Sequence, residues 1–586
     1  MAPVSQWEPP AAAKAVSLAE STAAAPKHLL TVGERSQWTE TGHYADSVEY
    51  AKALEKASPW VKTVTIGRSP QGRDIVATIV SKDRAFTPEA ARRTGKLIVL
   101  LESCIHPGEV DGKEAGEMLL RDVAVTKKYA AWLDQVILIN IPIFNVDGHE
   151  IWSGYTRINQ QGPKEMGFRA NAMRLNLNRD FIKADAPEMR AWLRFFNAWL
   201  PDFFIDNHVT DGADFQYDVT IDAPMSQDIW ENLAKWTRER YLPALQDAMT
   251  TDGHVMGPYG GFRQRGKPES GFQAQSLIPR YSTGYAAVQN RPALLVETHS
   301  LKTFKTRSWG HYNIMRRSIE ILVRDPKTLQ TAVREADRAV AALAGNGTKV
   351  HLDGTPSDES KPFTFRGLKA VARPSALSGS SVLVYQKETE DIATKLFDRT
   401  NTTLAATMPK GYYVPAEWIE VIERLEWHGV KFERTTKEIQ GEFSTYRLKE
   451  PKWTTVPFEG RLAVDFKALA VKEKRTIPVG SVYVPMNQRA ARVVLNLLEP
   501  AAPDALVRWG FMNSIFEQKE YFSDYVFEPI AQEMARRHPQ LKAEFDGKVV
   551  GDAKFAANPR ARLQWWYERS PYLEPDRDAY PVVRVE

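Results

Sequence analysis

The stretch K-L-I-V-L-L-E-S-C-I-H-P-G-E-V-D-G, residues 96–112, joins an apolar run to a loop with titratable side chains. The run Lys96–Glu102 is rich in branched apolar residues and predicts a buried strand. Pro107 and Gly108 cannot continue a regular helix, so the H-P-G-E step is expected on the loop after that strand. Open α/β sheets hold their sites at the carboxyl ends of strands, so this stretch predicts both the fold class and a functional loop.

Three side chains around this loop have the chemistry of a catalytic zinc site. His106 and Glu109 stand in the loop, and His208 follows the apolar run P-D-F-F-I-D, residues 201–206. That run predicts a second strand, and His208 is expected just past its end. Two histidines and a carboxylate leave one coordination position open, whereas a structural zinc site uses four ligands, usually with cysteines. The single cysteine, Cys104, excludes the structural kind and is expected to be a small buried residue.

Two later motifs contain charged residues of the kind that bind substrates or take part in catalysis. Asn178 and Arg179 stand together in R-L-N-L-N-R-D-F. A guanidinium beside an amide matches a carboxylate, because arginine donates two parallel hydrogen bonds to it. Glu297 follows the apolar run 293–296, which predicts a short buried strand. A carboxylate at the end of such a strand is unusual unless it is paired or takes part in a reaction.

The order of these motifs resembles that of the zinc carboxypeptidase family, the metallocarboxypeptidases of the carboxypeptidase A type. H-x-x-E, N-x-D-G, N-R, H and E follow one another in the family's order over about residues 45–325. The stretch Thr65–Ile75 resembles the family's lead-in hairpin before the zinc strand. The segment Asn145–Gly148 resembles its Asn-Pro-Asp-Gly turn, with valine in place of proline.

The resemblance implies a role for each of these residues. The family's three ligands of a single zinc ion per chain correspond to His106, Glu109 and His208. Glu297 would be the general base that takes a proton from the water at the zinc, whose pKa the metal lowers to about 7. Asn178 and Arg179 would hold the terminal carboxylate of a peptide substrate and so fix which amide lies over the metal.

Two roles of the family have more than one candidate. The arginine that polarises the scissile carbonyl is either Arg157, in G-Y-T-R-I-N, or Arg169, in M-G-F-R-A-N. We favour Arg169, because its loop leads directly into the N-R segment. The tyrosine that closes over the substrate is either Tyr281 or Tyr285, and either one is equally compatible with a place in the core.

One position departs from the family. Two residues before the N-R pair, where the family commonly has aspartate, this chain has Asn176. An amide oxygen can still accept the N–H of the first zinc histidine and fix its tautomer, but it adds no negative charge. We therefore expect a less basic ligand at His106. His299, two residues after Glu297, is expected either to touch the site or to be structural.

The chain is predicted to have four parts. Residues 1–45 are rich in Ala, Pro and Ser and are expected to form an arm. Strand and helix patterns alternate over 46–345, which predicts an α/β catalytic domain with a mixed central sheet and helices on both faces. The stretch 346–362 is predicted as a linker. Residues 363–586 are expected to form a C-terminal α+β domain of unknown role, either an interface or a cover over the cleft.

Several elements are predicted from periodicity. In the catalytic domain, helices are expected over 46–57, 114–125, 188–200, 307–323 and 329–344, with a strand over 136–144. In the C-terminal region, strands are expected over 382–385, 430–433 and within 462–484, and helices over 416–428, 487–498, 525–537 and 561–569.

Composition restricts the function further. The chain has 586 residues, of which 43% are hydrophobic, as expected for a globular protein of more than one domain. A net charge of +4 without a basic run gives no indication of nucleic acid binding, and no apolar stretch is long enough to span a membrane. The N-terminus lacks the pattern of a signal peptide. We expect a periplasmic or secreted protein whose signal was removed, with a cytoplasmic protein as the alternative.

The leading hypothesis is a zinc exopeptidase that releases the C-terminal residue of a peptide. A zinc-dependent deacylase of N-acyl amino acids, similar to aspartoacylase, shares H-x-x-E and a downstream N-R; the lead-in hairpin and the N-V-D-G segment favour the peptidase. A binding protein without activity is disfavoured because the zinc ligands and Glu297 are all present. Cell-wall peptides or internal bonds as substrates, the preferred terminal residue and the oligomeric state stay open.

Overall fold

A mixed eight-stranded sheet forms the centre of the N-terminal half of the computed structural model, which describes residues 5, 7–9, 18–274 and 278–586. In spatial order its strands are β1 (Val61–Arg68), β2 (Asp74–Val80), β4 (Val136–Ile141), β3 (Leu97–Ser103), β5 (Phe203–Thr210), β10 (Ala293–His299), β6 (Val219–Asp222) and β7 (Met256–Pro258). The four central strands β4, β3, β5 and β10 are parallel, while β2 and β6 run antiparallel beside them. The predicted mixed sheet is confirmed.

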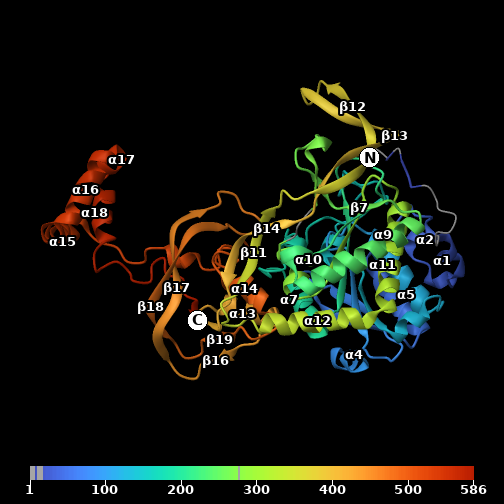
Figure 1. Cartoon of the computed structure of the whole chain (residues 1–586), viewed down its shortest axis with the longest axis horizontal. Helices are drawn as coiled ribbons and strands as arrows, with labels where there is room; N and C mark the ends of the chain where they lie inside the picture. The colour runs from blue at the N-terminus through green and yellow to red at the C-terminus, as the bar shows by residue number, and fades with distance from the viewer. Residues whose placement is uncertain (1–4, 6, 10–17, 275–277) are drawn as a thin grey trace.

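Helices cover both faces of this sheet (Figure 1). Side chains alternate along β3, so that Ile98 and Leu100 enter one core with Trp192, and Val99 and Leu101 enter the other. The first core is covered by α7 (Pro187–Trp199) and α10 (Ser282–Val288). The second is covered by α3 (Tyr44–Ala57), α5 (Asp111–Ala124), α11 (Phe304–Arg324) and α12 (Pro326–Ala341).

Two strands are longer than the sequence predicts. β5 and β10 pair in parallel register up to Thr210 and His299, so His208 and Glu297 lie inside strands rather than just beyond them. The expectation of strand ends at residues 206 and 296 was therefore wrong. Pairing between the two strands continues through these polar residues, whose side chains are buried.

The predicted arm contains short helices in the part that the structure describes. Residues 1–4, 6 and 10–17 lie outside the described part of the chain. The helices α1 (Leu18–Ala24) and α2 (Val32–Arg35) pack against α5. The buried guanidinium of Arg121 on α5 donates to Glu34 at 2.6 Å and to the carbonyl of Leu29 at 3.0 Å.

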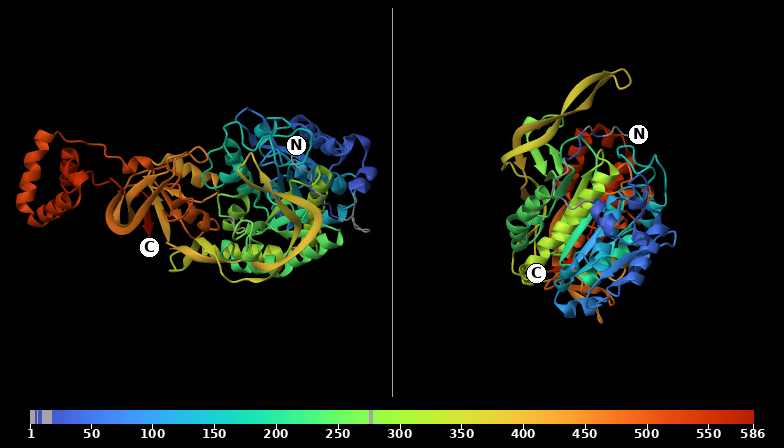
Figure 2. Two further views of the ribbon diagram at one scale, coloured as in Figure 1. Left: turned by 90° about the horizontal axis from the view of Figure 1, so that it is seen from above. Right: turned by 90° about the vertical axis from the view of Figure 1, so that its right-hand side faces the viewer.

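The predicted linker 346–362 contains β11 (Lys349–Pro356), which pairs with β14 (Thr400–Thr407). A long hairpin follows, formed by β12 (Lys361–Ser375) and β13 (Ser380–Phe397). Its base joins β9 (Phe272–Ala274) and β8 (Gly260–Phe262), and its tip projects from the body (Figures 1 and 2). The strand predicted over 382–385 lies near the beginning of β13, most of whose side chains are exposed.

The rest of the C-terminal region forms a second sheet and a helical module (Figure 1). The second sheet has the order β16 (Glu433–Arg434), β19 (Val482–Pro485), β15 (Gly411–Val414), β20 (Val583–Val585), β17 (Ile439–Trp453) and β18 (Val464–Ile477). It packs with α13 (Ile419–Trp427) and α14 (Ala491–Leu498). The strand predicted over 430–433 is reduced to the two-residue β16.

The helical module extends away from the body on two connecting segments (Figures 1 and 2). It consists of α15 (Asp524–Arg537), α16 (Pro539–Gly551), α17 (Ala553–Ala556) and α18 (Pro559–Tyr567). An aromatic core of its own includes Phe527, Phe545 and Trp565. The helices predicted over 525–537 and 561–569 are confirmed within two residues. Among the described helices, none is long and apolar enough to cross a membrane.

Candidate active site

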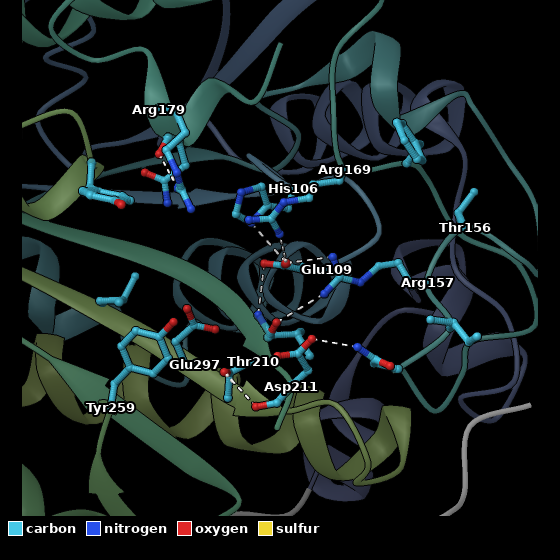
Figure 3. Close-up of a pocket in the computed structure, with 17 residues that line it drawn as sticks. His106, Glu109, Thr156, Arg157, Arg169, Arg179, Thr210, Asp211, Tyr259 and Glu297 are labelled. Atoms are coloured by element: carbon cyan, nitrogen blue, oxygen red, sulfur yellow. Dashed lines mark hydrogen bonds and ion pairs between the residues drawn. The ribbon is translucent and has the colours of Figure 1, made fainter. Parts of the chain in front are cut away.

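His106, Glu109 and His208 converge at the carboxyl end of the central strands (Figure 3 shows the first two). Each is buried, and their ligand atoms lie within 4.8 Å of one another. Glu109 joins the two histidines: its Oε1 lies 3.1 Å from His106 Nδ1, and its Oε2 lies 3.0 Å from His208 Nδ1. The sequence motifs therefore meet in space as the zinc hypothesis requires.

The far nitrogen of each imidazole is already occupied. His106 Nε2 lies 3.0 Å from Asn176 Oδ1, which is the contact that the sequence predicts. His208 Nε2 lies 2.7 Å from Asp206 Oδ2, a partner that sequence reasoning missed. Outer partners of this kind set the tautomer, so that both Nδ1 atoms face the carboxylate of Glu109. A donor set of two nitrogens and one carboxylate, with the rings fixed from behind, suits zinc.

Asp206 had a signal in the sequence. It stands two residues before His208 in F-F-I-D-N-H, and residues two apart in a strand point to the same face. Ser282 Oγ, at the start of α10, donates to the same carboxylate oxygen. The acid behind the second histidine is thus itself held in place, and it carries a negative charge that the amide of Asn176 behind the first histidine lacks.

Electrostatics favour a cation between these residues. Burial alone would raise the pKa of Glu109, but the charges of His106 and Arg157 hold it well below its usual range. Burial lowers the pKa of His106 to about 4. His208 behaves differently, since the negative charge of Asp206 outweighs burial and raises its pKa well above the ordinary value. Glu109 is therefore ionised and His106 neutral, as metal binding requires, whereas His208 has to lose its proton when a metal binds.

Glu297 faces the same space from β10, where it is the register partner of His208. Its Oε2 is buried and has no hydrogen-bond partner among the described residues. Burial raises the pKa of Glu297 to about 8, against the influence of His208. Tyr259 lies beside it (Figure 3), and the charge of Glu297 raises the pKa of that phenol. Tyr259 was not predicted, because nothing in its local sequence marks it.

These residues line a cavity of about 520 Å³ together with both candidate arginines. Arg157 Nη1 lies 3.0 Å from Glu109 Oε1, and the side chain of Arg157 is 13% exposed. Arg169 Nη1 lies 3.9 Å from the same oxygen, and its side chain is 45% exposed. Arg157 also donates to the carbonyl of Val209 at 3.3 Å. A Cβ at Gly108 would lie 2.2 Å from Arg157 Cδ, so the glycine of H-P-G-E makes room for this arginine.

Asn178 and Arg179 also line the cavity, and Arg179 lies across it from Arg157 (Figure 3). Asn178 Oδ1 accepts the N–H of Ser282 at 3.1 Å, and its amide lies 3.4 Å from His208 Nε2. The guanidinium of Arg179 lies 4.4 Å from the ring centre of Tyr281, which also lines the cavity. This stacking leaves Arg179 in the cavity wall without an ion-pair partner among the described residues.

Two expected site residues lie elsewhere. Tyr285 is fully buried in the core under α7, and its hydroxyl contacts His428 Nδ1 at 2.9 Å, so it cannot close over a substrate. His299 is structural, because its Nε2 donates to the carbonyl of Ala213 at 2.6 Å. Cys104 is buried and lies outside the ligand set, as expected.

Residues 47–312 match the family model described as zinc carboxypeptidase. They form a domain of the zinc carboxypeptidase family. Carboxypeptidase 2 of Trichophyton rubrum is 22% identical over 484 residues, covering 79% of this chain and 82% of that protein. Carboxypeptidase 2 of Trichophyton equinum is 21% identical over 474 residues, with 79% and 82% covered. The resemblance seen in the motifs is thus confirmed for this domain, which is that of a metallopeptidase, a hydrolase that acts on peptide bonds.

Solved structures of carboxypeptidases are also similar to part of this chain. A metallo-carboxypeptidase from Burkholderia cenocepacia is 18% identical with a TM-score of 0.34, covering 48% of this chain and 69% of that one. Carboxypeptidase A from Helicoverpa armigera is 15% identical with a TM-score of 0.35, covering 50% and 74%.

Proposed function

We propose that this zinc carboxypeptidase removes the C-terminal residue of a peptide, with one zinc ion held by His106, Glu109 and His208. The observation that carries the proposal is a cavity lined by His106, Glu109, Glu297 and Arg179, with His208 3.0 Å from Glu109. Zinc bound there would act as a Lewis acid on the scissile carbonyl and lower the pKa of a water molecule. The remaining chemistry belongs to residues of the chain.

Glu297 is proposed as the general base. It faces the ligands from the neighbouring strand, and its Oε2 is free to accept a proton. A pKa of about 8 is well matched to a group that must take a proton and return it to the leaving amine near neutrality. The apolar core behind β10 keeps Glu297 from turning away from the cavity.

Arg157 is proposed as the residue that polarises the carbonyl, in preference to Arg169. Both are close to Glu109, but Arg157 is more deeply buried and is held by the carbonyl of Val209. A donor that is already fixed loses little entropy when charge develops on the substrate oxygen. The sequence favoured Arg169 because of chain order alone. The contact of Arg157 with the carbonyl of Val209 cannot be read from the sequence.

Asn178 and Arg179 are proposed to bind the terminal carboxylate. Arg179 has no anionic partner of its own among the described residues, and Tyr281 supports its guanidinium from one face. A free carboxylate is therefore the natural ligand for this side chain. Tyr259, beside Glu297, is proposed to contact the substrate, a role that Tyr285 cannot have.

The experiment that tests this function compares three kinds of substrate by mass spectrometry. Peptides with a free C-terminus, the same peptides amidated, and N-acyl amino acids are incubated with the purified zinc form. We expect loss of single C-terminal residues from the free peptides and much slower cleavage of the amidated ones. Arg179→Ala should narrow that gap, since charge-assisted bonds are worth about 1.5–3 kcal/mol. Equal cleavage of free and amidated peptides would favour internal bonds, and selective turnover of N-acyl amino acids would favour a deacylase.

The setting of the activity is a separate proposal. We propose a periplasmic or secreted enzyme, because bacterial proteins that resemble this family are often exported. Fractionation of the native source cells tests this, with a cytoplasmic location as the contrary result.

A further inference from the structure

A turn of the C-terminal region contacts Asn176, the residue whose side chain lies against His106. Phe458 and Arg461 form two reciprocal backbone hydrogen bonds of 2.9 and 3.1 Å, which close a turn over Glu459 and Gly460. The φ angles of these two central residues are 48° and 79°. Turns with two left-handed central residues strongly prefer Asn-Gly or Asp-Gly. Glutamate at the first position is therefore conformationally unfavourable, which raises the question of what its longer side chain does.

The turn is fixed by a contact to the catalytic domain and by two aromatic residues of the C-terminal region. Arg461 forms two bonds of 2.7 Å to Asp185, and its guanidinium lies 3.5 Å from the ring centre of Phe511. The ring of Phe458 stacks on Trp509 with centres 6.0 Å apart. These contacts hold Glu459 at a constant place beside residues 175–185.

The side chain of Glu459 then reaches Asn176. Its Oε2 accepts the backbone N–H of Asn176 at 2.7 Å. The side-chain oxygen of Asn176 faces His106 Nε2 at 3.0 Å and also accepts the N–H of Asn178 at 3.0 Å. One carboxylate outside the family domain is thus connected through Asn176 to a zinc ligand and to a proposed substrate-binding residue.

We propose that Glu459 is a positioning residue, which fixes Asn176 against His106 and supplies the negative charge that asparagine lacks at this place. The inference rests on the proposed zinc site. His208 has a carboxylate directly behind it, in Asp206. His106 has an amide, and the nearest carboxylate in this chain of contacts is one residue further out, on Glu459. Partners behind metal ligands tune metal affinity, so Glu459 should affect zinc binding at a distance.

The test is zinc affinity, measured by competition with a chelator on the full chain. Glu459→Asn keeps a residue suited to the turn but is too short to reach Asn176; Glu459→Gln keeps an acceptor and removes the charge. The matched control is Glu450→Asn, since Glu450 lies on the same hairpin with a φ of 56° and pairs with the exposed Lys467. We expect zinc affinity to fall about tenfold in Glu459→Asn, less in Glu459→Gln, and not in the control.

A rescue separates positioning from general stability. Asn176→Asp places a charge directly behind His106, so it should restore zinc affinity when combined with Glu459→Asn. A fold damaged by losing the turn contact would not recover in this way. If the parent chain binds zinc and both Glu459 variants bind it equally well, or if the rescue fails, the inference is wrong while the proposed function stands. A parent chain that binds no zinc overturns both.

Discussion

The zinc site and the C-terminal extensions use strands in opposite ways. β5 and β10 are buried except for the half-buried Thr210, and they pair with each other in parallel register. β12 and β13 are longer, yet most of their side chains are exposed, and their tip projects from the body (Figure 2). Length therefore does not make a strand rigid. Burial on two faces does, and the groups proposed for chemistry lie where it is found.

The largest effect is expected from removing one buried ligand of the proposed zinc site. His208→Ala leaves Glu109 with a single histidine, and two protein ligands rarely hold a catalytic zinc ion. We expect metal content and peptidase activity to be lost together, measured by elemental analysis and by a peptide cleavage assay. His538→Ala is the control, because His538 is exposed at the start of α16 in the helical module. Full zinc in His208→Ala would contradict the ligand assignment.

Glu297→Gln should separate chemistry from metal binding. The amide is nearly isosteric but cannot accept the proton, so we expect normal zinc content and a fall in kcat of about 10²–10⁴-fold. Substrate binding should be kept, as judged by the KM of the residual activity or by the ability of the inactive variant to compete with the parent enzyme for substrate. Near-normal turnover would place the general base elsewhere.

A pair of arginines compares buried with exposed groups inside the cavity itself. Arg157→Ala removes a fixed donor, and we expect kcat/KM to fall by about 10²–10³-fold, as for other preorganised oxyanion donors. Arg169→Ala removes a side chain that is 45% exposed, and its effect should be clearly smaller. Kinetics of both variants on one peptide decide the matter; a larger loss in Arg169→Ala would restore the preference that chain order suggests.

The sequence predicts the buried half of the molecule far better than the extensions. His106, Glu109, His208 and Glu297 follow from motifs next to apolar runs, and these runs become β3, β5 and β10. Long-range partners were not predictable. Tyr259 enters the cavity through a turn between two three-residue strands, and Glu459 contacts a residue 283 positions away.

Errors cluster where burial gives no periodic signal. The predicted linker became β11, and the helices of the predicted arm pack on α5 through polar contacts such as Arg121 to Glu34. Composition alone indicates neither the strand β11 nor the packing of these helices on α5. Tyr281 and Tyr285 illustrate the same limit. They are four residues apart on one short segment, yet Tyr281 lines the cavity and Tyr285 lies in the core.

The contact between the two regions should respond to acid. Arg461, Lys183 and Arg424 hold the pKa of Asp185 at about 2, against the effect of burial, while an unfolded aspartate titrates near 4. A lowered folded-state pKa gives stability that is present above about pH 4 and is lost as pH falls toward 2. Asp185→Asn should therefore destabilise the chain by about 2 kcal/mol at neutral pH, and the difference should shrink in that acidic window.

Urea unfolding at pH 7 and pH 3 measures this effect. Asp546→Asn is the matched control, because Asp546 pairs with Lys542 at the surface of the helical module, and exposed pairs contribute about 0–1 kcal/mol. A difference for Asp185→Asn that does not depend on pH would show that packing, rather than charge, holds this contact.

The smallest effect is expected from removing the helical module altogether. Its aromatic core is formed by its own residues, and the N–H of Lys519 donates to Glu574 at 2.7 Å, so the two connecting segments lie close together. Replacing residues 521–573 with a short Gly-Ser linker should therefore leave zinc content unchanged and kcat/KM on short peptides within about twofold, the scale of changes far from a site. The same assays as for Glu297→Gln measure this. A large loss on short peptides would mean that the module supports the catalytic domain from a distance, and the contrast between a self-sufficient buried site and separate extensions would not hold.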